Sequence, residues 1–140
     1  MADAVTSMSS VRSGSIPGGG SWDLYKVFDS ELVNGTADVD SVFGSGAPGM
    51  ELGQFRTFGL YVVLTGTTPD VLFQLLQSFD NTAANFEVPD ADGTIATITD
   101  TAIHQVTVHP TQMPFFRIRA NGQTGNGTNV RVTAYIWIQT

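Results

Sequence analysis

Residues that could carry chemistry are few in this sequence of 140 residues. The two histidines, His104 and His109, differ in parity, so along a strand they point to opposite faces and could not share a metal ion. The sequence contains no Gly-x-Ser-x-Gly elbow, no His-Glu-x-x-His pair and no phosphate-binding glycine loop that ends in Lys. A glycosidase-like pair among the carboxylates is not indicated, because most Asp residues occupy turns. We therefore expect no catalytic residues and no enzymatic activity.

One acidic turn, Asp90-Ala91-Asp92-Gly93, offers oxygen ligands of the kind that hard cations prefer, with Asp80 and Asp100 nearby in sequence. It lacks the third spaced acid of an EF-hand loop, and Thr101 occupies the position of the terminal Glu. Turn chemistry explains these residues better than calcium binding. The absence of Cys excludes disulfides and thiolate metal sites. The expectation is no metal and no cofactor, with cation binding at the 90–92 turn left open.

Charge and hydropathy exclude several classes of partner. The formal net charge is −7 and Lys26 is the single lysine, so no basic footprint for nucleic acid or for an anionic membrane exists. No apolar stretch approaches the ~20 residues of a membrane helix, and the N-terminus lacks the features of a signal peptide. Charged residues make up only 14% of the chain. A surface with so little charge is inexpensive to desolvate and is common where neighbouring protein covers it.

The chain divides into an arm and a domain. Residues 1–21 are rich in Ser, Gly and Ala and cannot bury enough apolar surface to order themselves, which predicts a flexible N-terminal arm. Residues 22–140 are expected to form the domain, with a short apolar segment at 22–28 and a Gly-rich region at 34–53. The sequons Asn34-Gly35-Thr36 and Asn126-Gly127-Thr128 are interpreted as turns.

From residue 54 onward the alternation of apolar and polar residues is typical of strands, and no window has sustained helical periodicity. We predict strands at 57–65, 71–79, 94–99, 103–109, 116–120 and 130–138, with a weaker one at 85–88. Strands at this spacing, separated by Gly, Asn and Asp turns, predict an all-β fold. The expected architecture is an antiparallel β-sandwich, jelly-roll-like, with an extended N-terminal arm.

The last two strands carry the candidate binding site. Their even-numbered apolar residues are expected to face the core, which leaves the odd-numbered residues on the outside. Treated as one hairpin, they place five outward residues on a single face: Arg117, Arg119, Arg131, Tyr135 and Trp137. Arg, Tyr and Trp dominate interface hot spots, so this face is predicted to be intermolecular. The alternative is that the arm or the Gly-rich region folds back over it.

The last ~85 residues resemble the discoidin- or carbohydrate-module-like β-sandwiches of tailed-bacteriophage virion proteins. The matching segments are 75–81 with Phe86, then 116–122, and finally Tyr135-Ile136-Trp137-Ile138. Asn81 stands where the pattern has Gly. The arm ahead of them resembles the extended arms by which capsid and decoration proteins attach to neighbours.

This resemblance implies a virion structural protein, foremost a head decoration (cement) protein or a related head or tail protein. Its expected partners are other virion proteins and copies of itself, and its expected location is the virion after synthesis in the host cytoplasm. The alternative is a glycan- or receptor-binding module, since aromatic side chains with polar neighbours also suit sugars.

Overall fold

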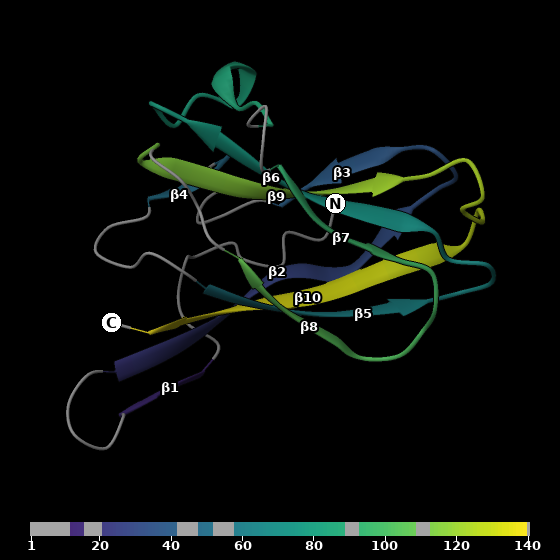
Figure 1. Ribbon diagram of the computed structural model, residues 1–140, viewed down its shortest axis with the longest axis horizontal. Helices are drawn as coiled ribbons and strands as arrows, with labels where there is room; N and C mark the ends of the chain where they lie inside the picture. The colour runs from purple at the N-terminus through teal and green to yellow at the C-terminus, as the bar shows by residue number, and fades with distance from the viewer. Residues whose placement is uncertain are drawn as a thin grey trace.

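The computed structural model describes residues 12–15, 21–41, 48–51, 58–88, 93–108 and 113–139 (Figure 1). Within these ranges the chain forms strands, turns and one turn of 3-10 helix, η1 (Ala83–Asn85), and no α-helix. The strands are β1 (Arg12–Ser15), β2 (Ser21–Val33), β3 (Asp38–Asp40), β4 (Met50–Glu51), β5 (Phe58–Thr65), β6 (Val71–Ser78), β7 (Thr94–Ile98), β8 (His104–Val108), β9 (Phe115–Gly122) and β10 (Val130–Gln139). They pack as two antiparallel sheets, so the predicted all-β sandwich is confirmed.

The order of strands in the two sheets is that of a jelly roll. Sheet A has the order β1-β2-β10-β5-β8, and sheet B has the order β3-β9-β6-β7 with β4 also paired to β9. The pairings are nested along the chain: β2 pairs with β10, β3 and β4 with β9, β5 with β8, and β6 with β7. The β5–β10 and β6–β9 pairs then complete the two sheets. The chain therefore behaves as one long hairpin rolled into two layers, which is a jelly-roll-like sandwich of the kind predicted.

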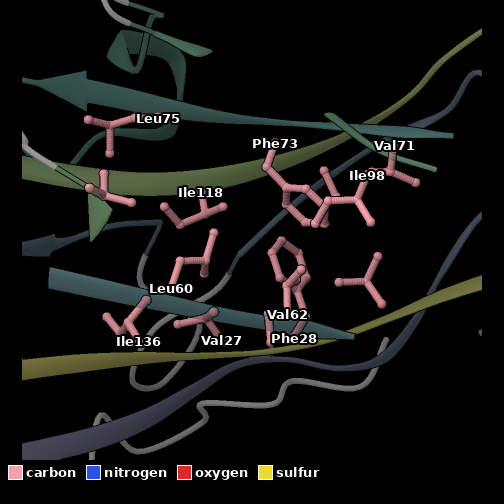
Figure 2. Close-up of a cluster of buried hydrophobic side chains, with 14 of the residues drawn as sticks. Val27, Phe28, Leu60, Val62, Val71, Phe73, Leu75, Ile98, Ile118 and Ile136 are labelled. Carbon is pink, nitrogen blue, oxygen red and sulfur yellow. The ribbon is translucent and has the colours of Figure 1, made fainter. Parts of the chain in front are cut away.

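The core lies between the sheets and is made largely by alternation along the strands (Figure 2). In β5 the residues Phe58, Leu60, Val62 and Leu64 are buried, while their neighbours are less so. Stacked rings of Phe58 and Phe116, whose centroids are 4.9 Å apart, join the two sheets. Such a two-layer core is the arrangement that inward faces with period two produce.

Two expected elements differ from the structure. The apolar segment at 22–28 is part of β2, a strand of 13 residues. Its alternation is hidden because Val27 and Phe28 are both buried and Ser30 has a φ of 52°, where the pairing with β10 shifts register. The weak strand at 85–88 is wrong in part: η1 ends at Asn85, and Glu87 makes a single bridge to Gln77.

Within the predicted arm, the structure describes Arg12–Ser15 and the first residue of β2. Strand β1 pairs antiparallel with Ser21–Leu24 at the edge of sheet A. The rest of the arm, residues 1–11 and 16–20, lies outside the described residues.

Three loops at one end of the sandwich are joined by a single side chain, that of Asn126, which is 8% exposed. Its Nδ2 donates to the carbonyl oxygens of Val33, at 2.9 Å, and Gly35, at 2.8 Å. Its Oδ1 accepts from the amide of Asp70 at 2.9 Å. The sequon that begins at Asn126 is therefore a structural turn, as predicted. Since every polar atom of the amide is used, Asn126 fixes the spacing of loops that are distant in sequence.

Glycine is required where these loops meet. A Cβ at Gly122 would collide with the carbonyl oxygen of Gly35, and one at Gly127 would collide with that of Thr67. The amide of Gly127 donates to the Thr68 carbonyl at 3.0 Å, and that of Gly122 to the Ala37 carbonyl at 2.9 Å. The glycines in this part of the chain therefore permit close backbone contact between loops.

Ile136→Ala should lower the free energy of unfolding by about 2–5 kcal/mol, because Ile136 is fully buried at the centre of sheet A. Thr107→Ala, at an exposed position of β8 in the same sheet, should change it by less than about 0.5 kcal/mol. Urea unfolding of both variants provides the comparison. Equal effects would mean that the assignment of inward and outward faces is incorrect.

Asn126→Ala should cost about 3 kcal/mol, because it leaves the Asp70 amide and two carbonyls without their partner. The matched control is Asn34→Ala, which removes the exposed Asn of the other sequon. Thermal unfolding should distinguish the two variants clearly. A control as destabilised as Asn126→Ala would contradict the role assigned to Asn126.

Candidate interaction surface

The five predicted interface residues do not share a face. Arg117 and Arg119 belong to β9 in sheet B, whereas Arg131, Tyr135 and Trp137 belong to β10 in sheet A. The prediction of one hairpin is wrong, because the segment between Gly122 and Val130 carries the chain from one sheet to the other. The two groups therefore lie on opposite outer surfaces of the sandwich, with the layer of β10 below that of β9 in Figure 1.

The predicted alternation within each of these strands is confirmed. The even-numbered apolar side chains are at most 4% exposed: Phe116, Ile118, Ala120, Val130, Val132, Ala134, Ile136 and Ile138. Their odd-numbered neighbours consequently point away from the core. The local pattern was thus interpreted correctly on both strands, although their placement relative to one another was not.

Trp137 is 43% exposed, more than any other apolar side chain described on sheet A. It lies in a row across four strands, with Leu24 of β2 on one side and Gly59 of β5 and then Thr107 of β8 on the other. A Cβ at Gly59 would stand 3.7 Å from Cε3 of Trp137, so the indole lies along the bare backbone of β5. The indole is therefore supported from beneath while its other face stays open to a partner.

The neighbouring row contains Lys26, Tyr135, Tyr61 and Gln105. The rings of Tyr61 and Tyr135 meet edge to face with centroids 6.0 Å apart, and Nζ of Lys26 lies 5.5 Å from the centroid of Tyr135. Burial opposes the charged form of Lys26, but Tyr135 and Asp29 outweigh it and raise the pKa of Lys26. The lysine is therefore cationic at neutral pH and lies over the Tyr135 ring.

A further row has Leu32, which is 39% exposed, beside Arg131 and Thr65. Nη1 of Arg131 donates to the carbonyl oxygen of Ser30 at 2.7 Å. At that atom the guanidinium is therefore oriented by a backbone carbonyl and not by a carboxylate. These three rows contain two cations, one of which, Lys26, pairs with Asp29 of β2 at 3.4 Å. We name their large side chains the aromatic face: Leu24, Lys26, Leu32, Tyr61, Arg131, Tyr135 and Trp137.

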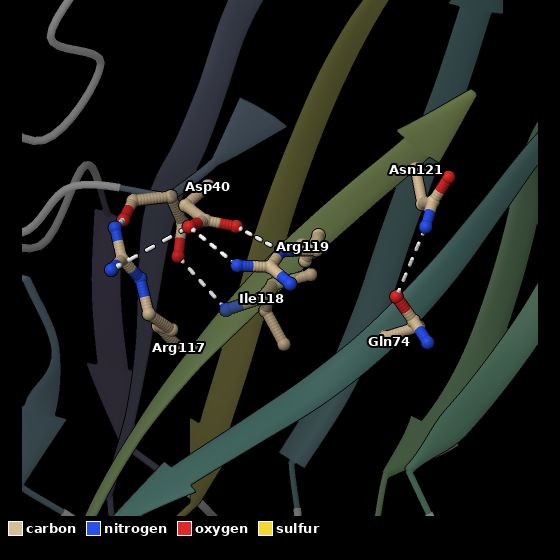
Figure 3. Close-up of polar contacts among 7 residues, drawn as sticks. Asp40, Gln74, Arg117, Ile118, Arg119 and Asn121 are labelled. Atoms are coloured by element: carbon tan, nitrogen blue, oxygen red, sulfur yellow. Dashed lines mark hydrogen bonds and ion pairs between the residues drawn. The ribbon is translucent and has the colours of Figure 1, made fainter. Parts of the chain in front are cut away.

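Arg119, by contrast, is satisfied inside the molecule (Figure 3). Its Nε and Nη2 donate to the two oxygens of Asp40 at 2.7 and 3.2 Å, a bidentate pair. The hydrogen bond to Asp40 is the main cause that raises the pKa of Arg119. Arg119 therefore anchors β3 to β9 and is not a free contact residue.

Arg117 is covered, with only 8% of the residue exposed. Nη2 donates to the carbonyl oxygen of Ser41 at 3.2 Å, Nη1 lies 3.6 Å from Asp40, and the Phe86 ring centroid is 5.5 Å from the guanidinium carbon. Burial lowers the pKa of Arg117, and Asp40 offsets part of that effect. Because Ser41 belongs to the Gly-rich region, the alternative prediction, in which that region folds back over the face, holds for Arg117.

Several residues of these surfaces were not identified from the sequence. Leu24 and Lys26 point outward on β2 and alternate with Tyr25. The segment before the bulge is too short for the sequence to indicate which of its two sides faces outward. Asp40 and Phe86 pack on β9 from positions far away in the chain, and no local signal identifies them.

The candidate metal and catalytic residues add little to a functional site. Nε2 of His104 lies 2.6 Å from Oδ1 of Asp100, and that contact is the main cause that lowers the pKa of Asp100. His109, Asp90 and Asp92 lie outside the described residues. The described ranges contain no group of three or more His, Cys, Asp or Glu that could hold a metal ion. They also contain no helix that is long and apolar enough to span a membrane.

Asp40→Asn should destabilise the domain by about 2 kcal/mol or more, since it leaves two partly buried guanidinium groups without their carboxylate. Asp38→Asn, two residues earlier on β3 and exposed, is the matched control and should have little effect. The urea dependence of tryptophan fluorescence measures both. If the two variants lose the same stability, Asp40 does not hold β3 to β9.

Comparison with known proteins gives likeness of structure only. No family model matches the chain, and no curated protein is significantly similar to it in sequence. Its structure is similar to that of the SPBc2 prophage-derived protein YomS, with a TM-score of 0.47 and 13% identity over 85% of this chain and 95% of that one. It is also similar to the coat protein of Tobacco streak virus, with a TM-score of 0.46 and 10% identity over 90% of each chain.

Proposed function

We propose that this protein is a structural component of a virus particle, which associates with copies of itself and with other virion proteins through the aromatic face. The observation that carries the proposal is the exposure of Trp137 on the outer side of sheet A, which it shares with Tyr135, Lys26 and Arg131. An apolar surface with cations and aromatic rings, left open on a stable domain, is typical of protein interfaces. The role as a head decoration protein, or a related head or tail protein, is the finer form of the same proposal.

Three further observations support this function. The jelly roll is a recurrent fold of viral capsid domains. The last ~85 residues resemble modules of phage virion proteins. Only 14% of the residues are charged, which lowers the cost of burying the surface in an assembly. The proposal includes no catalytic activity and no cofactor.

A glycan-binding module is the second candidate, because jelly rolls also include lectin domains and because Tyr61, Tyr135 and Trp137 lie near one another on a flat face. Sugar rings stack on such aromatic side chains, and Gln105 in the same row offers a polar group. The two candidates use the same surface but differ in the partner that it binds.

Trp137→Ala should weaken self-association of the full chain by about 2 kcal/mol or more, while unfolding changes much less. Sedimentation velocity over a range of concentrations measures the association. The control is Thr107→Ala, an exposed position in the same row, which should associate like the wild type. A wild-type chain that stays monomeric and binds sugars on a glycan array through Trp137 would replace this proposal with the second candidate.

A further inference from the structure

A second exposed apolar patch lies at one end of sheet B. Phe79 is 66% exposed and Met113 is 44% exposed, the former directly after β6 and the latter just before β9. Ser78 pairs with the partly buried Phe115, so the chain on either side leaves the ladder at the same end of the sheet. The backbone at Phe79 therefore lies close to the backbone that leads into Phe115, although Met113 follows Phe79 by 34 residues in the sequence.

Phe79 is presented by an ordered turn. Oδ1 of Asp80 lies 3.2 Å from the Ser78 hydroxyl and accepts from the Thr82 amide at 3.2 Å and from Nδ2 of Asn85 at 3.0 Å. Backbone hydrogen bonds between Gln77 and Glu87, at 2.9 and 3.1 Å, close the base of the turn. An apolar side chain that is held outward in this way loses little conformational freedom when it binds, which is the property of an interface anchor.

Carboxylates gather at this end of sheet B. Glu51 pairs with Phe115 across β4 and β9, Asp80 adjoins Phe79, and Glu87 lies at the base of the turn. Among the described residues, the cation at this end of sheet B is Arg117, which is buried under Phe86 and Ser41. We name the set the Phe79 patch: Glu51, Phe79, Asp80, Glu87, Met113 and Phe115. Its partner must combine apolar side chains with positive charge.

The aromatic face has that chemistry, with Lys26 and Arg131 among Leu24, Leu32 and Trp137. It lies on sheet A, whereas the Phe79 patch lies on sheet B. One molecule cannot bring its own patch to its own face. We infer that the Phe79 patch of one copy docks on the aromatic face of the next copy. This inference rests on the proposed function, since it names the partner of the same face.

The contact is heterologous, because the two surfaces that meet are different. Each added copy leaves one patch and one face open, so the arrangement produces a ring or an extended array and not a closed pair. Symmetric alternatives are less favourable. Two aromatic faces would bring Lys26 and Arg131 against their own kind, and two Phe79 patches would bring three carboxylates against three.

Mixing two defective variants tests the inference. Phe79→Ser keeps the aromatic face and loses the patch, whereas Trp137→Ala keeps the patch and loses the face. Each alone should associate at least about 30-fold more weakly than the wild type. Mixed in equal amounts, they should form pairs of one copy of each and nothing larger, as measured by light scattering with one variant labelled. Ile103→Ser, at another apolar position that is 59% exposed, is the control and should associate normally.

A charge exchange tests the same contact without removing an apolar group. Glu51→Lys with Glu87→Lys in one chain, and Lys26→Glu with Arg131→Glu in another, should each impair association, and mixing the two should restore pairs. If Trp137→Ala prevents association but Phe79→Ser and the Glu51/Glu87 variant do not, the inference is wrong and the proposed function stands. If the wild type is monomeric at every concentration, the inference is wrong, and the glycan array then decides the proposed function.

Discussion

The antiparallel pairing of β10 with β2 and β5 is the interaction on which the rest of the structure depends. It joins the last strand of the domain to an early one and thereby closes the roll. It also fixes which side of β10 faces the core. A slip of one residue would bury Arg131 and Trp137 and expose Ile136. The free energy that this exchange would cost fixes the register of β10. The burial of Ile136 and the exposure of Trp137 therefore have the same cause. The aromatic face is the outer side of the strand that completes the core.

The two ends of the sandwich differ in a way that follows from this closure. At one end, loops that come from both sheets meet, and Asn126 with its surrounding glycines joins them through buried hydrogen bonds. At the other end, β6 and β9 leave the ladder together, and the turn around Asp80 uses its hydrogen bonds to hold Phe79 outward. Similar local chemistry, an Asn or Asp side chain bonded to backbone, closes one end and exposes an apolar group at the other.

Features that depend on neighbouring residues in the chain were predicted correctly from the sequence. Features that depend on pairing between distant segments were not. The alternation in β9 and β10 identified the core residues, since the two-residue period follows from strand geometry alone. The hairpin between them was wrong, because Asn and Gly between Gly122 and Val130 suit a crossing between sheets as well as a tight turn. The role of Arg119 was missed for the same reason: Asp40, its partner, is 79 residues away. Lys26 and Leu24 joined the candidate surface only through the pairing of β2 with β10.

The distribution of charge connects the fold to assembly. In sheet B, Arg117 and Arg119 are matched by Asp40 within the molecule, so these cations contribute little to the outside field. In sheet A, Lys26 lies over the Tyr135 ring and pairs with Asp29, and Arg131 lies beside Leu32, while Glu51, Asp80 and Glu87 lie at the Phe79 end of sheet B. A molecule with net charge −7 should repel its own copies, and an uneven distribution of that charge is a way to limit the repulsion to wrong orientations. In the proposed contact between copies, apolar contact supplies the affinity and charge supplies the head-to-tail direction.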